Sequence, residues 1–141
     1  MSSLNCKPLI FVVDDEPIIS STVAMILECK GFDAKPFTNP LEALAAACIM
    51  APDLLLSDVV MPQMSGVDLA IQVKGQCPDC KVLLFSGQAA TADMLRGARA
   101  LGHDFELLTK PVHPADLLKR IQCMIEVTLP TVPSGEMRVA A

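Results

Sequence analysis

Short apolar runs alternate along the chain with longer segments of helical periodicity. The run Leu9–Val13 is apolar throughout and lies between Pro8 and Asp14, which is typical of a strand buried on both faces. Two similar runs and two with a weaker pattern are also predicted strands: Leu54–Leu56, Val82–Phe85, Phe32–Phe37 and Phe105–Leu108. We therefore expect five strands.

Helix start signals lie between these strands. Asn39 precedes Pro40, and Glu42 follows at the third helical position, which is close to a capping box. Four further helices are predicted from start residues followed by helical spacing, and they begin near Pro17, Ser65, Thr91 and His113. Strands that alternate with helices of this length predict βαβ units, a parallel sheet and helices on both of its faces.

The domain organisation follows from this alternation. The chain has 141 residues, of which 52% are hydrophobic and 19% charged, and a length of this order favours one domain. We expect an α/β domain of (βα)5 pattern over residues 7–127. Residues 128–141 contain Pro130, Pro133 and Gly135 with few apolar residues, and they are predicted to form a short flexible tail.

Composition excludes several classes of protein. The mean hydropathy of +0.46 suits a membrane protein, but the longest uncharged apolar stretch, Ala43–Ala51, falls short of the roughly 20 residues of a spanning helix. Met1–Lys7 lacks the pattern of a signal peptide. The six cysteines are therefore expected to be reduced thiols in a cytoplasmic protein.

Charge argues against direct DNA binding. The formal net charge is −5, and no stripe of Lys or Arg is available to neutralise phosphates. The chain also lacks Trp and Tyr, so it has few rings on which bases could stack.

Polar residues stand where the predicted strands end. They are Asp14 and Asp15, then Asp58, Ser86 and Lys110. The carboxyl ends of parallel strands carry the working residues of open α/β sheets, so these side chains should meet at one edge. Three neighbouring carboxylates repel one another, and a hard cation such as Mg²⁺ relieves that repulsion. A carboxylate can also accept a phosphoryl group, while a lysine and a hydroxyl can contact phosphoryl oxygens.

These residues, together with Met61-Pro62, Gly66 and Lys110-Pro111, resemble the receiver domain of two-component response regulators over about residues 7–127. The resemblance implies a doubly wound, flavodoxin-like sheet of order 2-1-3-4-5. It also implies that Asp58 is the phosphoacceptor. The implied Mg²⁺ ligands are Asp14, Asp15, Asp58 and the main-chain carbonyl of Val60. Lys110 would contact the phosphoryl group, Ser86 would be the switch hydroxyl, and Pro111 would be a cis-proline.

The sequence departs from the family pattern in two respects. Leu107 stands where receivers usually have an aromatic switch residue, so the usual rotation of a ring is in doubt. In the family, two further positions tune dephosphorylation; here they hold Val60, which cannot orient an attacking water, and Gln88, which could.

We therefore expect a stand-alone receiver that takes a phosphoryl group from a sensor histidine kinase or a phosphotransfer protein and then acts on a downstream protein partner. It should not be an enzyme, beyond catalysing its own phosphorylation and dephosphorylation. The sequence also leaves open whether the protein forms a weak homodimer. Two alternatives are a degenerate receiver that binds partners without phosphorylation and, ranked lower, a phosphatase with an aspartyl-phosphate intermediate.

Cys77-Pro78-Asp79-Cys80 has the spacing of redox and zinc motifs. It precedes a predicted strand, whereas a redox motif belongs after one, and a second pair of zinc ligands is missing. We expect a loop with two incidental thiols.

Overall fold

The computed structural model describes residues 7–87, 91–102, 105–110 and 113–128. The strands are β1 (Leu9–Val13), β2 (Asp33–Phe37), β3 (Leu54–Asp58), β4 (Lys81–Ser86) and β5 (Glu106–Thr109). The helices are α1 (Pro17–Cys29), α2 (Pro40–Ile49), α3 (Gly66–Gln76), α4 (Thr91–Ala100) and α5 (Pro114–Thr128). Each predicted strand and helix therefore forms within the described residues, and strands and helices alternate as expected.

The five strands form one parallel sheet of order β2-β1-β3-β4-β5. This confirms the doubly wound order that the family resemblance implies. The register aligns the carboxyl ends of the strands, because Asp58 pairs with Phe85 and Ser86 pairs with Thr109. Polar residues at these ends consequently lie at one edge of the sheet.

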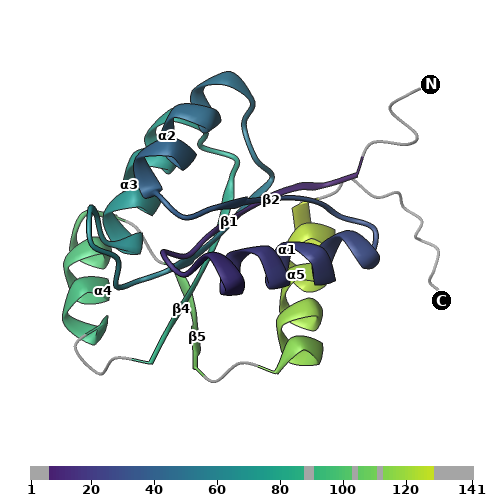
Figure 1. Cartoon of the computed structure of the whole chain (residues 1–141). Coiled ribbons are helices and arrows are strands. Elements are labelled where there is room, and N and C mark those ends of the chain that lie inside the picture. The colour runs from purple at the N-terminus through teal and green to yellow at the C-terminus, as the bar shows by residue number, and fades with distance from the viewer. Residues whose placement is uncertain (1–6, 88–90, 103–104, 111–112, 129–141) are drawn as a thin grey trace, which may run out of the picture.

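Helices cover both faces of the sheet (Figure 1). One face packs against α2, α3 and α4, with Ala43, Val67 and Ala98 buried against β1, β3 and β4. The other face packs against α1 and α5, with Leu27 and Ile121 fully buried. β1 and β3 are buried along their whole length, which explains why Leu9–Val13 and Leu54–Leu56 appear in the sequence as continuous apolar runs rather than as alternating ones.

Side-chain caps fix three helix starts where the sequence places cap residues. Asn39 Oδ1 accepts a hydrogen bond from the Leu41 amide at 2.9 Å, and Ser65 Oγ accepts one from the Asp68 amide at 3.0 Å. His113 Nδ1 accepts one from the Ala115 amide at 3.1 Å, so this histidine caps α5. These bonds satisfy amides that have no partner within the helix.

Some boundaries differ from the expected ones. β3 continues two residues beyond Leu56, because Ser57 and Asp58 still pair with β4 although both are polar. α5 ends at Thr128, the first residue of the predicted tail, and the rest of that tail lies outside the described residues. The division at 127/128 stays a prediction. Within the described part of the chain, no helix has the length and apolar character needed to cross a bilayer.

Candidate functional site

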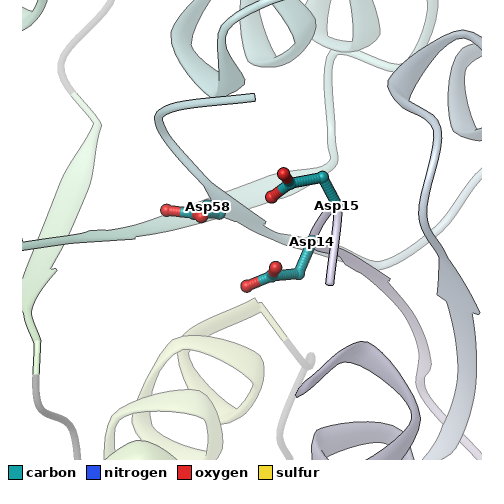
Figure 2. A group of neighbouring side chains, drawn as sticks. All are labelled: Asp14, Asp15 and Asp58. Carbon is teal, nitrogen blue, oxygen red and sulfur yellow. The ribbon is translucent and has the colours of Figure 1, made fainter. Parts of the chain in front are cut away.

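Three carboxylates meet at the carboxyl edge of the sheet. Asp14 and Asp15 directly follow β1, and Asp58 is the last residue of the adjacent β3. Figure 2 shows the three side chains at this edge, and each contributes an oxygen within 4.8 Å of the others. The structure therefore brings together the three acidic residues that the sequence singled out.

The three residues differ in burial. Asp14 is 1% exposed, Asp58 is 8% exposed and Asp15 is exposed to solvent. Asp14 Oδ1 accepts a hydrogen bond from the Glu16 amide at 2.9 Å, which anchors the turn between β1 and α1. Asp14 therefore holds this turn and does not cap α1, whose N-cap Glu16 makes no side-chain capping bond.

The second oxygen of Asp14 indicates which kind of ligand the site would accept. Asp14 Oδ2 is buried and has no hydrogen-bond partner. Burial raises the pKa of this carboxyl, and the charges of Asp58 and Asp15 raise it further, against the lowering effects of the Glu16 amide and Lys110. A buried oxygen without a donor, beside two further carboxylates, fits a hard divalent cation that takes oxygen ligands.

Lys110 brings the positive charge into this cluster. It directly follows β5, and its amide donates to the Ser86 carbonyl at 3.0 Å, which continues the pairing of β5 with β4. Its Nζ lies 3.3 Å from Asp58 Oδ2 and 3.9 Å from Asp14 Oδ2. Ser86, at the end of β4, is 3% exposed. All five residues that the sequence placed at strand ends therefore share this edge.

Gly66 fixes the backbone around Asp58. Its amide donates to the Val59 carbonyl at 2.7 Å, which brings the start of α3 against the end of β3. A Cβ atom at Gly66 would lie 2.1 Å from the Asp58 carbonyl oxygen and 2.9 Å from Ser57 Oγ. Only glycine allows this close approach, and it explains why a glycine follows the motif around Asp58.

Two predicted tuning positions lie outside the described residues, namely Gln88 and Pro111. Leu107 lies in β5 and is 36% exposed, while Phe105, just before the strand, packs against the cluster under α2, α3 and α4. Val60 is half exposed beside the site. The predicted roles of these residues stay predictions.

The thiols of the CxxC segment are buried in a loop. Cys77 and Cys80 are 8% and 1% exposed. Lys74 donates to the carbonyls of Pro78 and Cys80, at 3.0 and 2.8 Å, and so holds the loop closed. Burial raises the pKa of Cys80 to about 12. This environment disfavours the thiolate that redox chemistry and zinc binding both need.

Two residues of the site were missed in the sequence. Ser57 is fully buried and its hydroxyl donates to the Asp58 carbonyl at 2.8 Å. Phe85 lies under Lys110, with the ammonium 5.1 Å from its ring centroid. A serine inside an apolar strand was an available signal for Ser57. Phe85 carried no such signal, because an aromatic residue in a buried strand is ordinary.

A parallel sheet of this order, with acidic residues and a lysine at its carboxyl edge, defines a receiver-type α/β domain. Residues 10–122 match the family model for the response regulator receiver domain. The chain therefore belongs to the response regulator receiver family and is a receiver domain of two-component signalling.

Named relatives agree with this assignment. The chain is 33% identical over 131 residues to the probable transcriptional regulatory protein TcrX of Mycobacterium tuberculosis, covering 92% of this chain and 55% of TcrX. It is 30% identical over 129 residues to the alkaline phosphatase synthesis transcriptional regulatory protein PhoP of Bacillus subtilis, covering 92% of this chain and 53% of PhoP. The chain thus spans about half the length of these relatives.

Solved structures show the same fold. A CheY-like receiver domain protein from Methanospirillum hungatei superposes with a TM-score of 0.78 at 25% identity, covering 86% of this chain and 96% of the other. A receiver domain protein from Clostridium thermocellum superposes with a TM-score of 0.75 at 28% identity, covering 85% of this chain and 95% of the other.

Proposed function

We propose that Asp58 is the phosphoacceptor of this receiver domain. One of its carboxylate oxygens attacks the phosphorus of a phosphohistidine on a sensor kinase or phosphotransfer protein. A P–O bond to Asp58 forms while the P–N bond breaks, and the imidazole leaves with the bonding electron pair and takes up a proton. The supporting observation is that a lysine ammonium lies 3.3 Å from Asp58 Oδ2 within a cluster of carboxylates.

Asp14, Asp15, Asp58 and the main-chain carbonyl of Val60 would hold Mg²⁺ at this edge. When bound, the cation neutralises the charge of the incoming phosphoryl oxygens. Asp14 Oδ2 supports this assignment, since this buried oxygen accepts no hydrogen bond and would gain a ligand bond when a cation binds.

Lys110 and Ser86 would contact the phosphoryl group. The ammonium of Lys110 lies near both Asp58 and Asp14, so a phosphoryl oxygen on Asp58 offers it a new anionic partner. Ser86 lies on the strand next to Asp58 and carries a hydroxyl that can donate to a phosphoryl oxygen. Movement of these two side chains towards Asp58 would pass the change to β4 and β5.

The partners in this scheme are proteins. The donor is a sensor histidine kinase or phosphotransfer protein, and the output is a downstream protein surface. The names of several relatives describe transcriptional regulators, and those proteins are about twice as long as the segment they share with this chain. Within the present residues, the net charge of −5 disfavours direct contact with DNA.

Phosphorylation by a small donor tests this proposal. Incubation with Mg²⁺ and acetyl phosphate should add the mass of one phosphoryl group, and chelation of Mg²⁺ should prevent it. Asp58→Asn should gain nothing, whereas Asp68→Asn, a matched change in the exposed first turn of α3, should be phosphorylated like the wild type. Equal gain in the wild type and Asp58→Asn would exclude Asp58 as the acceptor.

A phosphorylation-independent binding module is the second candidate, and Leu107 supports it. This half-exposed side chain offers no ring to rotate into the sheet edge. Under this alternative, phosphorylation leaves the amide spectrum of β4 and β5 unchanged. Under the leading proposal, the amides of Phe85, Ser86 and Lys110 shift when Asp58 is phosphorylated.

A further inference from the structure

Lys110 needs more than its two carboxylate partners to stay in one place. Its side chain is 34% exposed, and its Nζ lies 3.3 Å from Asp58 and 3.9 Å from Asp14. An ammonium on a flexible four-carbon stem is strongly hydrated, and the exposed side of Lys110 leaves it free to turn towards water. A further contact would narrow the range of positions that the ammonium takes.

The ring of Phe85 supplies such a contact. The Lys110 ammonium lies 5.1 Å from the centroid of this ring, within the range of cation–π attraction. The negative face of an aromatic ring attracts a cation without competing for the carboxylate oxygens. Phe85 pairs with Asp58 on one side and with Leu108 on the other, so it lies between the phosphoacceptor strand and the strand that leads to Lys110.

The ring is itself held firmly by the core. Phe85 is 3% exposed and belongs to the apolar cluster under α1 and α5, with Ile10, Leu56 and Leu83 on β1, β3 and β4. A ring packed among fully buried neighbours has a fixed position. A contact between the two residues therefore restricts the lysine rather than the ring.

Three other aromatic rings are placed differently. Phe11 and Phe37 pack against each other with ring centroids 4.9 Å apart, and Phe32 lies in the cluster under α1 and α5. At the position where the family usually has an aromatic residue, Leu107 has no ring to offer. In the described part of the chain, the ring of Phe85 contacts the ammonium of Lys110 at the site.

We propose that Phe85 is a positioning residue for the phosphoryl chemistry, because its ring holds the Lys110 ammonium over Asp58 by cation–π attraction. This inference rests on the roles proposed above for Lys110 and Asp58. Leucine at position 85 would fill much of the same core volume but release the ammonium, whereas tyrosine would keep the ring face.

The first test does not depend on phosphorylation. In NMR spectra of lysine-labelled protein, the ε-methylene protons of Lys110 should be shifted upfield by the ring current, and their assignment follows from Lys110→Met. Phe85→Leu should return this signal to the range of the other lysines. Phe32→Leu, the same change in the same cluster, should leave it in place. A wild-type Lys110 signal at the ordinary lysine position overturns the proposal.

The second test measures chemistry at constant core volume. Phenylalanine at position 85 is replaced by analogues with increasing ring fluorination, which weakens the negative face and keeps the packing. The rate of phosphorylation by acetyl phosphate should fall progressively, by roughly two- to fivefold in total, with the thermal midpoint nearly unchanged. In a Lys110→Ala background the series should have no effect.

The outcomes separate the two levels of inference. A phosphorylation rate that is independent of fluorination contradicts the positioning role of Phe85. A wild-type protein that takes up no phosphoryl group contradicts the proposed function instead. The shift of the Lys110 protons then decides alone whether the ring holds the ammonium.

Discussion

Asp14 combines two opposing features in one side chain. One oxygen accepts a hydrogen bond from the Glu16 amide and anchors the turn, while the other is buried and accepts no hydrogen bond. A carboxylate in this environment costs free energy unless a cation is present, because desolvation disfavours its charged form. In the metal-free protein, the buried charge of Asp14 should therefore lower the free energy of unfolding relative to a variant that lacks this charge.

Asp14→Asn tests this cost. An asparagine keeps the oxygen that accepts the Glu16 amide and removes the buried charge. At pH 7 in EDTA, its free energy of unfolding should exceed that of the wild type by roughly 1–2 kcal/mol. The raised pKa of Asp14 sets the pH dependence. The stability contributed by the neutral carboxyl is complete below the unfolded value of 3.8 and is lost as pH rises through the higher folded pKa.

The difference between Asp14→Asn and wild type should therefore vanish near pH 3 and grow towards neutrality. Urea unfolding across this range in EDTA measures it. Asp15→Asn is the matched control, since Asp15 is exposed and its replacement should change stability much less. A destabilised Asp14→Asn protein at pH 7 in EDTA would contradict this account.

At the scale of elements, the position of the start of α3 depends on a glycine, which has no side chain. Gly66 brings the helix so close to β3 that a methyl group would overlap the Asp58 carbonyl, at 2.1 Å. Backbone atoms of a buried strand cannot move aside cheaply. The position of α3 is therefore tied to the position of Asp58, the proposed phosphoacceptor.

Two glycines of α3 give opposite predictions for the same substitution. Gly66→Ala should lower the free energy of unfolding by roughly 1–3 kcal/mol or more, because the helix or β3 must shift. At Gly75 a Cβ meets nothing within 4 Å, so Gly75→Ala should raise stability by about 0.5–1 kcal/mol through helix propensity. Denaturant unfolding of both variants checks this. Equal effects would show that the close approach at Gly66 is absent.

The loop between α3 and β4 gives a prediction about thiol reactivity. Native protein treated with iodoacetamide at pH 8 should be labelled at the exposed Cys29, Cys48 and Cys123 but not at Cys80. Peptide mapping measures this. Lys74→Ala removes both hydrogen bonds that close the loop and should increase labelling of Cys80. Rapid labelling of Cys80 in the native wild type would contradict the buried environment.

Alkaline pH tests the same thiol thermodynamically. Burial raises the pKa of Cys80 to about 12 in the folded protein, against an ordinary value of 9.0. The stability that the protonated thiol contributes is complete below pH 9 and is lost as pH rises towards 12. Cys80 should therefore lower the free energy of unfolding by roughly 1 kcal/mol per pH unit in this window. Cys80→Ala should show a correspondingly shallower decline.

At the scale of the whole molecule, cation binding should couple to folding. A cation that binds the native site and not the unfolded chain raises the free energy of unfolding by about 1.4 kcal/mol for each tenfold excess over its dissociation constant. We expect this rise in Mg²⁺ titrations monitored by urea unfolding. Asp14→Asn and Asp58→Asn should flatten it, while Asp68→Asn, outside the cluster, should retain the wild-type slope. A flat response in the wild type would argue against a magnesium site.

Much of the fold was accessible from the sequence for a physical reason. Strands buried on both faces need continuous apolar runs, and helices need caps, so both leave local signals such as Leu9–Val13 and Asn39. The strand-end residues were accessible because the topology forces them to one edge. The contacts of Gly66 with Asp58 and of Phe85 with Lys110 join residues distant in the chain. Their distances depend on tertiary packing, which no local pattern encodes.

The placement of Lys110 has a mechanical consequence. Asp58 ends a central, fully buried strand, whereas Lys110 follows β5, which pairs with β4 alone and has three exposed residues out of four. If Asp58 is phosphorylated as proposed, the phosphoryl group would draw Lys110 towards it, and β5 would shift more readily than β3 because it pairs with one strand where β3 pairs with two. The sheet thus combines a rigid, buried centre with one outer strand that can move more easily. A chemical change at the buried end of β3 would then become a displacement of the outer strand, where a partner could detect it.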